Sequence, residues 1–128
     1  MRAILSPFRY NADDNHFFAS LLLHHDHEHA IIAHLGAADR IVAISETCGG
    51  ADAIDLPLRQ IVGDALAHDA HDLVIAHNHP SGDPRPSDAD IETTRALAML
   101  LRPLGIRIHD HLILTHEKTT SFRVLGWL

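Results

Sequence analysis

Apolar residues in the N-terminal part of the chain are spaced for one helix and a β-hairpin. Two phenylalanines and two leucines would share one face of a helix over about residues 13–23, and Asn11 could cap its start. Two short apolar runs follow at residues 30–35 and 41–45, and the turn-forming residues 36–40 separate them. We therefore expect the two runs to pair as adjacent strands.

The remainder of the chain continues as alternating helices and strands. Apolar residues at helical spacing predict a helix that begins at Pro57, a favoured first residue, and continues to Leu66. The continuous apolar run 73–76 predicts a strand buried on both faces, and residues 88–101 predict another helix. Further strands are expected over residues 106–114 and 122–125. This alternation predicts an α/β or mixed α+β fold with a central sheet flanked by helices, and 128 residues predict a single domain.

Composition adds three expectations to this outline. The 17 acidic residues outnumber the 10 basic ones, and the resulting net charge of −7 argues against a general nucleic-acid-binding protein. Cys48, in a predicted loop, is the one cysteine, so the chain forms neither an internal disulfide nor a cysteine-based zinc cluster. The start of the chain does not resemble a signal peptide, and no apolar run approaches the roughly 18 residues of a membrane span. We therefore expect a soluble, cytoplasmic protein with no membrane partner.

Histidine is unusually frequent, with 13 copies, and it is the commonest metal ligand in proteins. His77 and His79 follow the predicted central strand, and Pro80 and Gly82 supply a turn that could bring both imidazoles to one ion. Asp90 would lie in the first turn of the next helix, folded back over the strand end. Two nitrogens and one carboxylate oxygen make three ligands and leave the fourth position of a zinc ion open for water, as in catalytic zinc sites.

The same residues also have a purely structural interpretation. Ser87 and Asp90 have the spacing of a capping box, in which a serine and a carboxylate close the first turn of a helix. A His-x-His pair at a strand end is by itself more often structural. The two features together, joined by the seven-residue loop 80–86, are more specific for a metal site. Ser87 could serve both purposes if its hydroxyl faced the metal.

The segment 77–90 resembles the JAMM signature of MPN-type metalloproteases: His-x-His, a spacer that has seven residues here, and Ser-x-x-Asp. Its wording, His-Asn-His-Pro-Ser-Gly-Asp-Pro-Arg-Pro-Ser, is similar to that of bacterial RadC-like proteins. The likeness covers about residues 28–128, and outside the motif it is carried by the segments 28–35, 56–62, 104–106, 110–113 and 121–123.

This resemblance implies an MPN (JAMM) fold with a zinc ion held by His77, His79 and Asp90. Glu28 would be the general base that activates the zinc-bound water and later passes its proton to the leaving amine. Ser87 would donate a hydrogen bond to the oxyanion. The implied reaction is hydrolysis of a peptide or isopeptide amide bond.

Several of these residues keep a second interpretation. Without the resemblance, Glu28 is an exposed acid in a polar turn, 49 residues before His77, and Glu46 is its nearest competitor. The histidine-rich run 24–29 could chelate a transition metal, but a solvated helix end is the simpler interpretation. His109 or His111 could support the metal site from behind a ligand, or could serve only the strand that contains them.

Two other functions compete with amide hydrolysis. The letters His-Asn-His and the DNA-repair association of RadC-like proteins point to a metal-dependent nuclease, although in HNH nucleases these residues are spread along a ββα element. A non-catalytic MPN binding module usually lacks metal ligands, whereas this chain keeps all of them. RadC-like proteins usually carry an N-terminal helix-hairpin-helix region, and we expect residues 1–27 to form a helical extension without it. Together with the acidic charge, this favours a protein or peptide substrate over nucleic acid.

Overall fold

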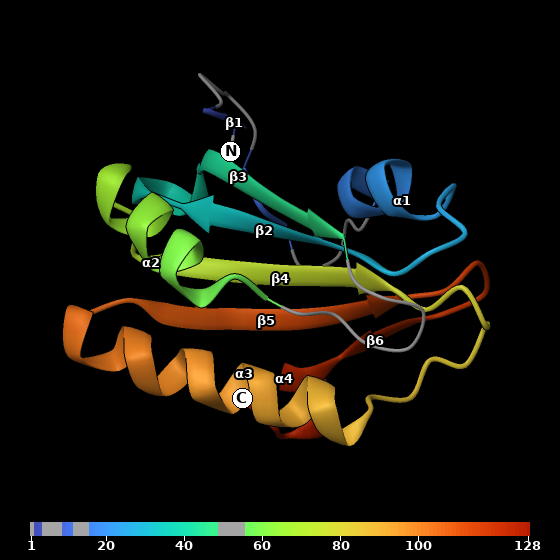
Figure 1. Cartoon of the computed structure of the whole chain (residues 1–128). Coiled ribbons are helices and arrows are strands. Elements are labelled where there is room, and N and C mark those ends of the chain that lie inside the picture. Colours follow the sequence, from blue (N-terminus) through green and yellow to red (C-terminus); the bar gives the residue numbers. More distant parts are fainter. Residues whose placement is uncertain (1, 4–8, 12–15, 49–55) are drawn as a thin grey trace.

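The computed structural model describes residues 2–3, 9–11, 16–48 and 56–128, which form one sheet with helices on both faces (Figure 1). The strands are β1 (Arg2–Ala3), β2 (His29–Leu35), β3 (Ile41–Cys48), β4 (Asp72–Asn78), β5 (Arg107–Leu114) and β6 (Thr119–Ser121). The α-helices are α1 (His16–Leu22), α2 (Leu58–Ala67), α3 (Asp88–Leu101) and α4 (Phe122–Leu125), with 3-10 turns at Ala37–Asp39 and Arg102–Leu104. The mixed α/β class expected from the sequence is confirmed.

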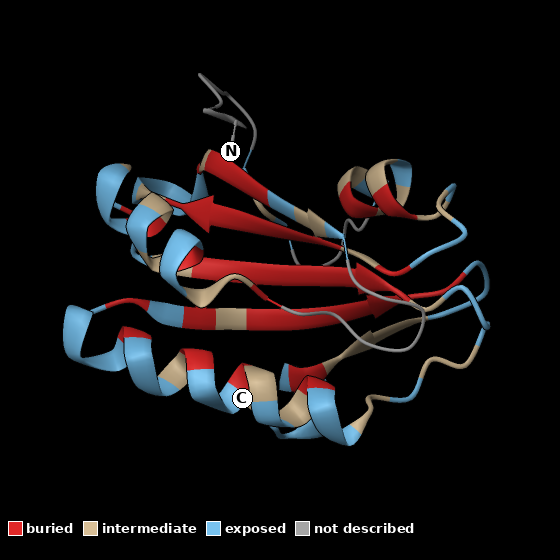
Figure 2. Ribbon diagram, in the orientation of Figure 1, coloured by how far each residue is buried: buried red, intermediate tan, exposed pale blue. Residues whose placement is uncertain are grey.

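The strands follow the order β1-β3-β2-β4-β5-β6 across the sheet. β2 and β3 form the antiparallel hairpin that the sequence predicts. β4 and β5 are parallel, because the chain returns along α3 before it enters β5. β4 therefore lies between two long neighbours, and its residues 73–78 are buried, as Figure 2 shows.

Two apolar clusters lie on the two faces of the sheet. Ile75 of β4 belongs to the cluster that also contains Ile61 of α2 and Leu97 of α3. Val74 belongs to the other cluster, in which Phe18 of α1 is buried. Because side chains alternate along a strand, odd-numbered positions of β4 face α2 and α3, and even-numbered positions face α1. This alternation decides where the residues of the 77–90 motif point.

The predicted helices agree with the structure to within a residue where they can be compared. α3 has the predicted bounds of 88–101, and α2 begins at Leu58 with Pro57 as its N-cap rather than as its first residue. α1 lies within the predicted range 13–23, and residues 12–15 lie outside the described residues. In the described ranges no helix is long and apolar enough to cross a membrane.

The prediction of a strand over residues 122–125 is wrong, because these residues form α4 and the strand before them is β6. The hydroxyl of Ser121 accepts a hydrogen bond from the N–H of Val124 at 3.2 Å, and Asp110 Oδ1 accepts one from the N–H of Arg123 at 3.1 Å. These two acceptors close the first turn of the helix. An apolar run of four residues has no periodicity that separates helix from strand, so contacts with β5 decide the outcome.

Candidate metal centre

The carboxyl end of β4 carries both histidines of the motif. His77 is at an odd-numbered position of β4, so its ring lies on the α3 side of the sheet, where it is 1% exposed. His79 lies just beyond the strand, where the chain turns: the N–H of Gly82 donates to the His79 carbonyl at 3.0 Å, and Gly82 has a φ of 87° that favours glycine. This turn brings the Nε2 atoms of the two rings to 2.9 Å from each other.

Asp90, in the first turn of α3, adds a carboxylate to the two imidazoles. Its Oδ1 lies 3.5 Å from His77 Nε2, and its Oδ2 lies 3.4 Å from His79 Nε2. The capping box is also present, because the N–H of Ser87 donates to Asp90 Oδ2 at 2.9 Å and the N–H of Asp90 donates to Ser87 Oγ at 3.0 Å. The capping box of the structural interpretation is therefore present, and it also holds the Asp90 carboxylate beside the two imidazoles.

Both partners of the carboxylate affect its protonation. Burial alone would raise the pKa of Asp90, but its interactions with His77 and His79 hold that pKa well below its usual range. Burial would lower the pKa of His79, yet Asp90 and the Asp83 carbonyl raise it above its usual value. The centre is thus built to keep a buried negative charge opposite a cation.

Glu28 completes the group from a different part of the chain. Glu28 directly precedes β2. Ala30, two residues later, pairs with His77 of β4, and this pairing places the start of β2 beside the motif. Glu28 is 6% exposed, and its Oε1 lies 3.4 Å from His79 Nε2. The alternative of an exposed acid is therefore wrong. The competitor Glu46 is exposed on β3 and is not part of this group.

Asn78 has a role that sequence reasoning missed. It is 2% exposed and faces α1, away from the two histidines. Its Oδ1 accepts a hydrogen bond from the N–H of His29 at 2.7 Å, and its Nδ2 donates to the carbonyl of His27 at 2.9 Å. These two bonds flank Glu28 and fix its loop to the end of β4. The alternation of side chains along a strand is the signal that could have separated Asn78 from the histidines.

His111 of β5 supports the buried histidine from behind. His77 Nδ1 and His111 Nε2 lie 2.7 Å apart, and His111 Nδ1 lies 2.6 Å from Thr94 Oγ1. The other histidine of this strand, His109, instead packs against Tyr10, with ring centroids 5.4 Å apart. Of the two candidates for a supporting role, only His111 therefore touches a residue of the motif.

The hydrogen bonds allow ring tautomers that suit a metal ion. Burial lowers the pKa of His111 far below its usual value, and the neighbouring His77 lowers it further, so the ring is neutral. A neutral His111 can accept from His77 Nδ1–H and donate to Thr94, and the Nδ1–H of His79 donates to the Asp83 carbonyl at 2.7 Å. Both assignments leave the Nε2 lone pairs of the two motif histidines available for a metal.

The donor atoms fit a divalent cation. Four tetrahedral ligands at about 2.0–2.1 Å from a zinc ion would be about 3.3–3.4 Å from one another. The distances among the two Nε2 atoms and the Asp90 oxygens run from 2.9 to 3.5 Å, and Glu28 Oε1 lies 3.4 Å from His79 Nε2. Ligand atoms of Glu28, His77 and His79 all lie within 4.8 Å of one another, and this is the one such group in the described ranges.

A cleft of about 490 Å³ opens from the centre to the surface. Glu28 and His79 of the centre line this cleft together with Ser81 and Ser87. Ser87 Oγ already accepts the hydrogen bond of the cap, which leaves its O–H proton to donate to a molecule in the cleft. A substrate in this cleft would meet the carboxylate, the imidazole and the hydroxyl together.

Comparison with known proteins assigns the chain to a family. A model of the RadC-like JAB domain matches residues 9–127. The chain belongs to the RadC-like JAB domain family. The resemblance drawn from the 77–90 motif is thereby confirmed, and metal-dependent hydrolysis is the kind of chemistry that this family suggests.

Relatives of this RadC-like JAB domain carry the name UPF0758 protein, which states no activity. The protein from Cellvibrio japonicus is 37% identical over 113 residues, which are 88% of this chain and 50% of that protein. The protein from Rhodobacter capsulatus is 34% identical over 128 residues, or 99% of this chain and 58% of its own length. A relative from Methanospirillum hungatei is 40% identical over 102 residues, or 79% and 45%. The chain spans about half the length of these relatives.

The histidine-rich run of this RadC-like JAB domain follows α1. The rings of His25 and His29 stack with centroids 3.6 Å apart, and His24 lies 4.0 Å from His25. The run forms no group of three metal-binding atoms in the part of the chain that the structure describes. Besides Glu28, which lies inside the run, it contributes to the centre the backbone of His27 and His29, which Asn78 binds.

Proposed function

We propose that this domain is a zinc-dependent amide hydrolase, a metallopeptidase or isopeptidase that acts on protein or peptide substrates. One observation carries the proposal: the Nε2 atoms of His77 and His79 lie 2.9 Å apart, with carboxylate oxygens of Asp90 and Glu28 at 3.4 to 3.5 Å. A divalent cation among these atoms would be attracted by both carboxylates and bound by the imidazole nitrogens. In this proposal the cation is zinc.

His77, His79 and Asp90 would hold the zinc, and Glu28 would act as the base. Asp90 contacts both histidines and is fixed by the capping box of α3. Glu28 Oε1 lies 3.4 Å from His79 Nε2, and Glu28 belongs to a loop that borders the cleft. The fixed carboxylate of Asp90 suits a metal ligand, and the carboxylate of Glu28, at the cleft, suits a general base. When bound, zinc lowers the pKa of a coordinated water to about 7 and polarises a carbonyl.

Each remaining residue has a defined task in amide hydrolysis. Glu28 takes the proton from the attacking water and delivers it to the nitrogen of the leaving amine. Ser87 donates its hydroxyl proton to the oxygen of the tetrahedral intermediate, while its lone pair stays bound to the N–H of Asp90. His111 and the Asp83 carbonyl keep the two ligand rings in the required tautomer and orientation.

A set of three variants tests this assignment. Zinc content would be measured by plasma mass spectrometry, and hydrolysis with a fluorogenic peptide library and lysine-isopeptide substrates. Glu28→Gln should keep about one zinc per chain and lose activity by a factor of about 10² or more. Asp90→Asn should lose the zinc itself. Glu46→Gln is the matched control, an exposed acid outside the group, and should behave as wild type.

The opposite results would exclude the proposal. Wild-type protein without stoichiometric zinc would remove the metal chemistry. Amide hydrolysis that survives Glu28→Gln would remove the proposed base. The nuclease alternative gains no support from the geometry, because Asn78 binds backbone groups on the other face of the sheet and does not join the two histidines.

A further inference from the structure

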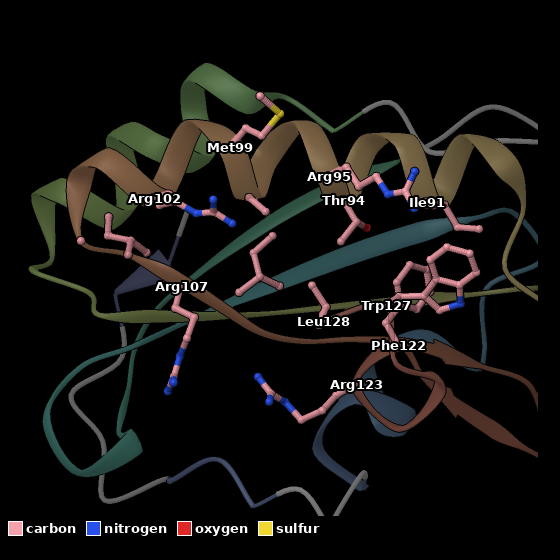
Figure 3. Close-up of a pocket in the computed structure, with 14 residues that line it drawn as sticks. Ile91, Thr94, Arg95, Met99, Arg102, Arg107, Phe122, Arg123, Trp127 and Leu128 are labelled. Carbon is pink, nitrogen blue, oxygen red and sulfur yellow. The ribbon is translucent and has the colours of Figure 1, made fainter.

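A second hollow lies along α3, outside the metal centre. It has a volume of about 800 Å³ and lies between α3, the start of β5 and the C-terminal segment that contains α4. Figure 3 shows Arg95 of α3 and Arg102, which directly follows α3, with Arg123 and Trp127 on the opposite wall. We call this hollow the arginine groove. None of the proposed zinc ligands lines it.

The groove concentrates positive charge on an acidic chain. Four of the 10 basic residues line it, although the net charge is −7: Arg95, Arg102, Arg107 and Arg123. Arg107 already pairs with Asp72 at 2.9 Å, and Arg123 Nε donates to the carbonyl of His109 at 2.6 Å. Arg95 and Arg102 form no ion pair with any carboxylate in the described ranges. These two guanidinium groups are available to an anionic ligand.

The rest of the lining is mostly apolar, and two of its large side chains are exposed. Met99 is 73% exposed and Trp127 is 44% exposed. Exposure of such large apolar side chains to water is unfavourable in free energy and is typical of interaction sites. The Arg95 guanidinium lies over the Trp127 ring, 5.4 Å from its centroid, and this cation–π contact holds the arginine at the wall of the groove. A ligand that fits must therefore combine negative charge with apolar side chains.

The spacing along α3 defines that ligand further. Arg95, Met99 and Arg102 lie at intervals of four and three residues, on one side of the helix. The two arginines are two turns apart, about 10 Å along the axis, with the methionine between them. A second helix with acidic residues seven positions apart and a leucine between them would match both charges and the apolar contact.

We propose that the arginine groove is a docking site for an acidic amphipathic helix of a partner protein. This proposal concerns a surface separate from the cleft and does not depend on zinc-dependent hydrolysis. A polynucleotide is the poorer match, because the groove is lined by more apolar than basic side chains and the rest of the chain is acidic. The apolar side chains instead suit the buried face of a helix.

Peptide binding provides the test. The probe is an alanine-based helical peptide with two glutamates seven positions apart and leucines between them, labelled with fluorescein. A second peptide replaces both glutamates with glutamine, and a short oligothymidylate represents nucleic acid. Binding is followed by fluorescence anisotropy and by the emission of Trp127, which is the only tryptophan of the chain and lines the groove.

The acidic peptide should bind wild-type protein about tenfold more tightly than the glutamine peptide and should change the Trp127 emission. The double variant Arg95→Gln/Arg102→Gln should lose this preference and bind both peptides equally. Arg40→Gln/Arg59→Gln is the matched control: it removes two exposed arginines outside the groove and should bind the acidic peptide within about twofold of wild type. Circular dichroism confirms that each variant is folded.

Three results would overturn the proposal. The acidic peptide could bind wild type no better than the glutamine peptide. The Arg95→Gln/Arg102→Gln variant could bind it as wild type does. Oligothymidylate could bind as tightly as the acidic peptide and displace it, which would assign the groove to nucleic acid.

Discussion

The side chain of Asn78 accepts a hydrogen bond from the backbone N–H of His29 at 2.7 Å, across 49 residues of sequence. This contact ties the loop of the proposed base to the strand that ends in the proposed ligand His77. The amide of Asn78 thereby sets the distance between Glu28 and the two histidines, without facing them.

Replacing Asn78 should separate hydrolysis from zinc binding. Asn78→Ala leaves the buried N–H of His29 without its acceptor, which should lower the free energy of unfolding by about 1–3 kcal/mol. Because Glu28 then loses its fixed position, hydrolysis should fall more than zinc affinity does. Urea denaturation, zinc titration and amide hydrolysis measure the three quantities.

Asn78→Asp serves as the graded control, because it keeps an acceptor for His29 and loses the donor to His27. Its activity should lie between those of wild type and Asn78→Ala. Equal loss of zinc and of activity in Asn78→Ala would contradict a role limited to the loop.

His111 should tune the affinity for the metal. His111→Phe removes the acceptor of His77 Nδ1–H. Loss of the hydrogen-bond partner of a metal-ligating histidine typically lowers metal affinity about 10- to 100-fold. Zinc titration against a competing chelator measures the effect. His109→Phe is the matched control on the same strand, where the ring packs on Tyr10, and it should leave the zinc affinity unchanged. Similar losses in both variants would point to a general disturbance of β5.

Removal of the metal should destabilise the protein. A ligand that binds only the folded state at 100 times its Kd adds about 2.7 kcal/mol, so zinc should raise the melting temperature and a chelator should lower it again. His79→Ala should melt at the same temperature with and without zinc. His27→Ala, whose side chain is 72% exposed, should keep the wild-type response. An undiminished zinc response in His79→Ala would place the metal elsewhere.

A buried histidine far from the centre should make stability depend on pH. His34 Nε2 lies 2.7 Å from Ser45 Oγ, which in turn donates to Asp64 Oδ2 at 2.7 Å. Burial lowers the pKa of His34 to about 4, and the nearby Asp64 opposes this only in part. In the folded protein His34 therefore stays neutral at pH values below 6.5, at which the same side chain is protonated in the unfolded chain.

The neutral His34 therefore contributes fully to the free energy of unfolding above pH 6.5. As the pH falls toward 4, this contribution is lost, by up to about 3 kcal/mol. Urea denaturation of wild type and His34→Gln from pH 7.5 to pH 4 should show a shallower decline in the variant. His71→Gln, which changes an exposed histidine, should retain the wild-type slope. Parallel curves for wild type and His34→Gln would show that His34 does not titrate in this range.

Local patterns in the sequence determined most of the architecture. α3 could be predicted with its bounds because Ser87 and Asp90 form a cap and the apolar residues after them recur at helical spacing. The strand at residues 73–76 and the hairpin before it follow from short apolar runs bounded by turns. The same rule failed at residues 122–125, where acceptors supplied by Ser121 and Asp110 stabilise a helix.

For the metal centre, too, some residues could be predicted from local sequence and others could not. His77, His79 and Asp90 could be predicted as a group because they lie within 14 residues and a turn joins them. Glu28 required the resemblance to a family, since no local pattern links it to a motif 49 residues away. Only the tertiary structure revealed Asn78 as the support of the Glu28 loop and His111 as the partner of His77. Their contacts span 49 and 34 residues, and the pairing of β2, β4 and β5 that creates them is a property of the folded sheet rather than of any segment.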